Sequence, residues 1–64
     1  MTIDTVRAEL AASAEAVERY RSRVAGLIDG LGADQEDLAS AMYEAERALH
    51  AAHRLLLQIG RAHV

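Results

Sequence analysis

The chain of 64 residues contains no cysteine, no proline, no lysine, no tryptophan and no phenylalanine. Without cysteine it can form neither a disulfide nor a thiolate metal site. Without proline, no residue forces a helix to break. A chain below roughly 70–80 residues that lacks such cross-links usually gains stability by associating with another chain. We therefore expect a single domain, residues 1–64, that forms oligomers.

Basic charge, aromatic residues and long apolar runs are also scarce. The net charge is −3 and the aromatic residues are Tyr20 and Tyr43, whereas nucleic-acid-binding domains generally carry basic patches and aromatic stacking groups. The longest run of large apolar residues, 55–57, is far shorter than the roughly 20 residues that span a bilayer. Asp4 and Glu9 lie where a signal peptide would be positively charged. We expect a cytoplasmic protein that binds neither nucleic acid nor membranes.

What the sequence does contain is an apolar repeat with alternating steps of three and four residues, typical of helices that pack along one face. In the first half the repeat consists of Ile3, Val6, Leu10, Ser13, Val17, Tyr20, Val24, Leu27 and Leu31. In the second half it consists of Leu38, Met42, Ala45, Leu49, Ala52, Leu56 and Ile59. The repeat predicts an all-α protein whose two helices pack through these rows.

Capping residues and glycines predict where the helices end. Thr2 or Asp4 can cap a first helix at about residues 3–29, and Gly30 is expected to close it in the left-handed conformation. Asp34 can cap a second helix at about 34–59, and Gly60 is expected to end it before a short tail. A turn as short as 30–33 forces the two helices into an antiparallel hairpin.

The second helix has a wider apolar arc than one neighbouring helix can cover, because Ala41, Ala48 and Leu55 lie beside its repeat. We therefore expect two hairpins to pair into a four-helix bundle, with a homodimer favoured. Polar Ser13 and Tyr20 would help to fix register and oligomer state. The expected oligomer interface is Leu10, Ser13, Val17, Tyr20, Val24, Met42, Ala45, Leu49, Ala52, Leu55, Leu56 and Ile59.

Catalytic and metal-binding patterns are weak. Glu46, His50 and His53 share a helix, but bundle di-iron sites use Glu-x-x-His pairs, and neither Glu44 nor Glu46 has a histidine three residues later. Ser13 falls within the apolar repeat, and two short helices leave little room for a substrate pocket. We expect no enzyme activity, no metal and no cofactor.

A possible second surface is formed by Tyr43, His50 and Leu57, which follow one another at intervals of seven residues. Aromatic and apolar side chains commonly anchor protein interfaces, and a histidine can add sensitivity to pH. The structural alternative is an ordinary exposed apolar surface. We name this row the partner stripe and expect it to bind a second protein partner if it is functional.

In outline, the hairpin is similar to the WXG100 proteins of type VII secretion systems, which pair as four-helix bundles. The turn here reads Gly30, Leu31, Gly32 without a tryptophan, and Tyr43 is followed four residues later by Arg47 rather than by an acidic residue. The length and hairpin plan also resemble the RNA-modulating Rop protein, through heptads alone. The sequence favours a small interaction or scaffold protein, with a secretion-associated bundle and an RNA-binding dimer as alternatives.

Overall fold

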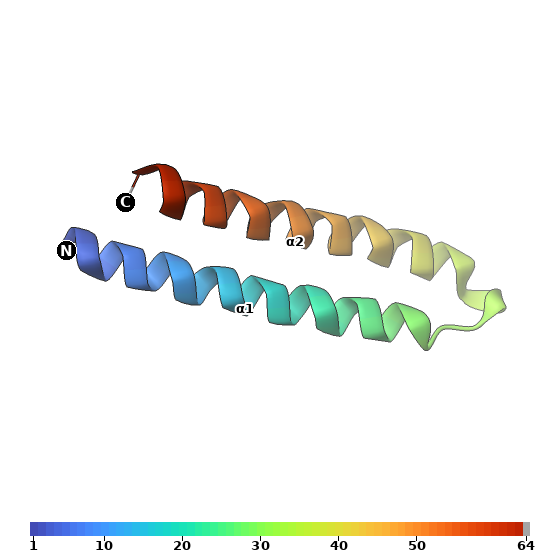
Figure 1. Cartoon of the computed structure of the whole chain (residues 1–64). Helices are drawn as coiled ribbons and strands as arrows, with labels where there is room; N and C mark the ends of the chain where they lie inside the picture. Colours follow the sequence, from blue (N-terminus) through green and yellow to red (C-terminus); the bar gives the residue numbers. More distant parts are fainter. Residues whose placement is uncertain (64) are drawn as a thin grey trace.

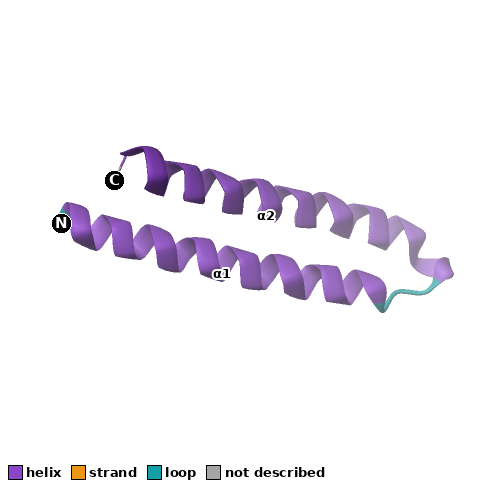
Figure 2. Ribbon diagram, viewed as in Figure 1, coloured by secondary structure: helices purple, strands orange, loops and turns teal. Residues whose placement is uncertain are grey.

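The computed structural model describes residues 1–63, with side chains described for 1–62, and it is a helical hairpin. Helix α1 spans Ile3–Asp29, a single 3-10 turn η1 spans Ala33–Gln35, and helix α2 spans Glu36–His63. The helices lie side by side and antiparallel, with the two chain ends together and the connection at the far end (Figures 1 and 2). The hairpin measures 50 × 15 × 15 Å. The prediction of two helices packed as a hairpin is confirmed.

Helix α1 begins with a side-chain cap. The backbone N–H of Thr5 donates to Oγ1 of Thr2 at 3.1 Å, and the two threonine hydroxyls lie 2.9 Å apart. Asp4 occupies the first turn, where the positive end of the helix dipole favours a carboxylate. Of the two predicted capping residues, Thr2 makes the cap.

The expected left-handed conformation at Gly30 is wrong. Gly30 has φ −85° and ψ −7°, and its N–H donates to the carbonyl of Leu27 at 3.1 Å. The N–H of Leu31 in turn donates to the carbonyl of Ile28 at 3.0 Å. These two bonds satisfy the last carbonyl groups of the helix without a reversal of hand, so the turn does not use the special freedom of glycine at this position.

The other turn glycine, Gly32, is extended at φ −86° and ψ 170°. A β-carbon built at Gly32 would lie 2.8 Å from Oδ1 of Asp34, so a larger residue there would displace the Asp34 side chain. The N–H of Gln35 donates to the Gly32 carbonyl at 3.0 Å and closes the 3-10 turn that leads into α2.

Helix α2 continues through Gly60 to His63, so the expected end at Ile59 is wrong. A glycine inside a helix costs only about 1 kcal/mol relative to alanine, and no proline follows it. Gly60 alone is therefore too weak a signal to predict where α2 ends. Val64, the last residue of the expected tail, lies outside the described residues.

The packing between the helices differs from the expected repeat by a rotation of each helix. The larger apolar rows are correct, since Leu10, Val17 and Val24 on α1 are half-buried, as are Met42, Leu49 and Leu56 on α2. Ala14 and Ile28 are the buried residues among 1–62. Their row on α1 continues through Arg21, while Ser13, Tyr20 and Leu27, which we expected to pack between the helices, are exposed.

The physical reason is that α1 has candidate packing residues on both sides of its central apolar row. One side is the row Ser13, Tyr20 and Leu27, and the other is the row Ala14, Arg21 and Ile28. A single neighbouring helix covers only one of these sides. The small side chain of Ala14 permits close approach, and Arg21 finds a charged partner across the hairpin, so the second side packs against α2.

No helix among the described residues is long and apolar enough to cross a membrane.

Candidate functional site

The rotation leaves one long side of the hairpin rich in uncovered apolar residues, which we call the apolar face. Because both helices are right-handed and run in opposite directions, a step of one residue back from the packed rows turns both side chains toward the same side of the hairpin. The apolar face therefore consists of Ser13, Tyr20 and Leu27 on α1 and Leu38, Ala45, Ala52 and Ile59 on α2, with Ala41, Ala48 and Leu55 beside them.

The large side chains of this face are substantially open to solvent. The exposed fraction is 55% for Tyr20, 56% for Leu27, 48% for Leu38, 57% for Leu55 and 42% for Ile59. Isolated exposed apolar residues are ordinary, whereas contiguous apolar patches are the kind of surface through which proteins commonly associate. This face is the first candidate functional site.

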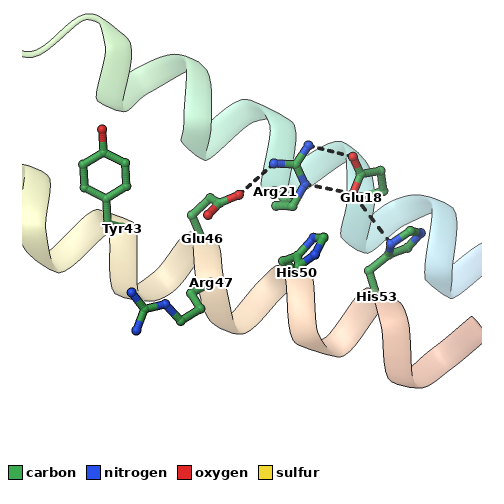
Figure 3. Close-up of a pocket in the computed structure, with 7 residues that line it drawn as sticks. All are labelled: Glu18, Arg21, Tyr43, Glu46, Arg47, His50 and His53. Carbon is green, nitrogen blue, oxygen red and sulfur yellow. Dashed lines mark hydrogen bonds and ion pairs between the residues drawn. The ribbon is translucent and has the colours of Figure 1, made fainter.

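The opposite side of the hairpin, which we call the polar face, carries a network of charged groups (Figure 3). The guanidinium of Arg21 on α1 donates to Glu18 through Nε at 2.9 Å and through Nη2 at 2.8 Å. Its Nη1 donates to Oε2 of Glu46 on α2 at 2.7 Å. His53 on α2 lies 3.8 Å from Glu18, measured from Nδ1 to Oε2. The network thus joins the two helices at two places, through Glu46 and through His53.

These contacts shift the pKa values of Glu18 and Arg21. The hydrogen bonds from Arg21 hold the pKa of Glu18 below its ordinary value, although partial desolvation opposes this, and the nearby His53 and His50 act in the same direction as Arg21. The hydrogen bonds to Glu18 and Glu46 raise the pKa of Arg21 above its ordinary value. Both carboxylates therefore favour the charged guanidinium that bridges them.

The residues of the network line an open groove of about 690 Å³. Tyr43, Arg47 and His50 line the same groove. Tyr43, His50 and His53 point from α2 toward α1 in Figure 3. Arg47 pairs loosely with Glu44, at 3.6 Å. Among the residues whose side chains the structure describes, no group of three or more His, Asp or Glu is placed to hold a metal ion. The groove offers a charged surface with its principal cation already held by two carboxylates.

In the structure, the residues of the partner stripe line two separate depressions. Tyr43 and His50 both line this groove. Leu57 instead lines a separate hollow nearer the chain ends, together with Leu10, Ala14 and other residues. The two residues that could anchor a partner, Tyr43 and Leu57, therefore do not share one depression.

The residues of the expected oligomer interface fall into two groups. Six lie in the central apolar rows and are half-buried between the helices: Leu10, Val17, Val24, Met42, Leu49 and Leu56. Six lie on or beside the apolar face: Ser13, Tyr20, Ala45, Ala52, Leu55 and Ile59. Of the latter, Ala52 is half-buried and the other five are exposed.

The sequence analysis did not predict the bridge from Arg21 to Glu46, which joins residues 25 positions apart in the chain. The available signal was that Arg21 lies four residues after Val17 and seven after Ala14, on the flank of the apolar row. Arg23, by contrast, lies over the ring of Tyr20, 5.3 Å from its centroid.

No family model, no curated protein and no solved structure matches this chain.

Proposed function

We propose that this protein is a non-enzymatic association module whose hairpin pairs with a second copy through the apolar face to form a four-helix bundle. The observation that carries the proposal is the contrast between two small sets of residues. Among residues 1–62 only Ala14 and Ile28 are buried, whereas five large apolar side chains on or beside one face are at least two-fifths exposed.

The size of the apolar face supports a partner of similar size. The backbone of the hairpin is 50 Å long and 15 Å wide, so one long face has a projected area of about 750 Å². A standard stable interface buries about 800 Å² on each partner. A second hairpin laid along this face would therefore form an interface of ordinary size, and it would supply the core that two helices alone do not have.

The distribution of charge favours a protein over a nucleic acid as the partner. Arg21 is bonded to two carboxylates, Arg23 lies over Tyr20, and the net charge is −3. Phosphate binding needs accessible cations in excess. The apolar face of the hairpin carries few charges, so it is better suited to bind a second apolar face.

The proposal is tested with two variants of α2 that carry the same change. Ala45 lies on the apolar face and Ala51 on the outer surface of the same helix, and both are exposed. Ala45→Arg places a charge at the centre of the proposed interface, whereas Ala51→Arg adds the same charge to a surface that stays in water. Burying an unpaired charge is strongly unfavourable.

We expect Ala51→Arg to sediment as a dimer and to melt at the wild-type temperature across a dilution series. Ala45→Arg should sediment as a monomer and lose helix at concentrations where the wild type is folded. Dimers of equal stability in both variants would refute the proposed interface.

A further inference from the structure

We infer that the second copy docks end for end, so that the turn of each hairpin lies beside the chain ends of its partner. This inference rests on the proposed self-association and adds to it the orientation of the two copies. Two independent features of the hairpin support it, namely the sizes of the side chains along the apolar face and the charges at its two ends.

The register of the hairpin fixes which residues of the apolar face lie at the same level. The bond between Arg21 and Glu46 places these two positions opposite each other. The residues that precede them, Tyr20 and Ala45, lie one step in opposite directions along the hairpin, so they are within about 3 Å of one level on the apolar face. One heptad nearer the chain ends, the corresponding level contains Ser13 and Ala52.

Only one orientation shares the side-chain volume evenly between these two central levels. End-for-end docking brings the level of Tyr20 against the partner level of Ser13 and Ala52, so that a bulky ring meets two small side chains. Side-by-side docking, with both turns at one end, would set Tyr20 of each copy against Ala45 of the other, so that both rings crowd one layer while the next layer holds only Ser13 and Ala52 from both copies. Interiors pack at high density, and both crowding and cavities are destabilising.

The outer levels accept end-for-end docking equally well. Leu27 and Leu38 form the level nearest the turn. Ile59 forms the level nearest the chain ends, together with the half-buried Val6, which continues the row of Ser13 by one heptad. End-for-end docking sets these two levels against each other, and both are built of branched aliphatic side chains. In the end-for-end orientation, each level of the apolar face therefore meets a partner level of suitable side-chain size.

The two ends of the hairpin also differ in charge. Residues 24–46 contain six carboxylates and no arginine or lysine. Those nearest the turn are Asp29, Asp34, Glu36 and Asp37, all exposed. The end of the hairpin that holds the chain ends has a mixed population: Asp4, Glu9, Arg7, Arg54 and Arg61.

Orientation decides how far apart the two acidic turns lie. Helices pack about 8–10 Å apart, so side-by-side docking would bring the acidic turns within about one to two screening lengths at physiological salt, where the Debye length is about 8 Å. End-for-end docking separates them by most of the 50 Å length of the hairpin and places each near the arginines of the other copy. The charges do not drive association, but they favour the same orientation as the side-chain sizes.

The test uses spin labels on single cysteines, which the cysteine-free chain permits without replacing any native thiol. Three exposed positions away from the apolar face are suitable: Ala33 in the turn, Ala8 near the chain ends, and Arg19 near the middle of α1. Each variant is first checked by sedimentation, and pulsed electron paramagnetic resonance then measures the distance between the two labels of a dimer. A mixed sample of the Ala33→Cys and Ala8→Cys proteins gives the distance between unlike ends.

We expect the two Ala33→Cys labels to be separated by most of the hairpin length, and the labels of mixed dimers to be close. The Arg19→Cys pair should give a short distance in either orientation, which confirms that dimers are being observed. Close Ala33→Cys labels, or comparable populations of close and distant labels, would overturn the end-for-end orientation while leaving self-association intact. A monomer in sedimentation, with no dipolar coupling at any position, would overturn both proposals.

Discussion

The two tyrosines provide a matched comparison of the two faces, because each is 55% exposed in the hairpin. Tyr20 lies on the apolar face and Tyr43 lines the groove of the polar face. Replacing either by alanine removes a similar amount of packing within a single hairpin. Only Tyr20→Ala should also weaken the association of two copies.

The expected size of this effect follows from the area that association would cover. A buried tyrosine removes roughly 150–250 Å² from water, so covering the exposed 55% of Tyr20 would remove about 80–140 Å². At about 25 cal/mol per Å² this area is worth roughly 2–3.5 kcal/mol. The hydroxyl group reduces the value, and we take about 2 kcal/mol per copy, or about 4 kcal/mol per dimer.

A loss of about 4 kcal/mol raises the dissociation constant of the dimer by roughly a thousandfold. The contact between Arg23 and the Tyr20 ring adds at most about 1 kcal/mol for an exposed pair, too little to account for such a change. The assay is sedimentation equilibrium of Tyr20→Ala and Tyr43→Ala across a concentration series. Dissociation constants that agree within tenfold would refute the assignment of Tyr20 to the interface.

Two further predictions concern the hairpin itself. Because Ile28 is 6% exposed, Ile28→Ala should destabilise the chain by about 2–3 kcal/mol through lost burial and a residual cavity, measured as a shift in the denaturant midpoint; an unchanged midpoint would place this residue outside the packing between α1 and α2. Because hydrogen bonds from Arg21 lower the pKa of Glu18 in the folded state, the stability that Glu18 contributes is present above its ordinary pKa and is lost as the pH falls through the lowered value. Acid titrations followed by circular dichroism should therefore show a smaller loss of stability in Glu18→Gln than in the wild type, and equal losses would contradict the role given to this contact.

The sequence was sufficient to predict the hairpin because its signals agree with one another. The three-four repeat, the cap at Thr2 and the glycine-containing turn at residues 30–33 all indicate two helices joined by a tight reversal. The bounds of α1 match the prediction to the residue. The bounds of α2 do not. It begins at Glu36 rather than at about residue 34, after a 3-10 turn that has no side-chain cap, and it runs past Gly60 because the helix penalty of glycine is small and nothing after it enforces a stop.

The rotation of the helices could not be predicted in the same way. Hydrophobicity favours the row of Tyr20 and Leu27 over the row that contains Arg21, so the apolar repeat points to the wrong flank of α1. The cost of placing Arg21 next to the packed rows is offset by its bond to Glu46, 25 residues away in sequence. A pairing across the hairpin is invisible to local periodicity, and it also explains why the apolar face is left uncovered.

The central claim is that the uncovered apolar face is completed by a second copy of the chain. Sedimentation equilibrium of the wild-type protein, combined with circular dichroism on the same samples, tests it most directly. The proposal predicts a helical species of twice the 6.9 kDa chain mass that loses helix as it dissociates on dilution. A fully helical species of 6.9 kDa that melts at the same temperature at every concentration would contradict it.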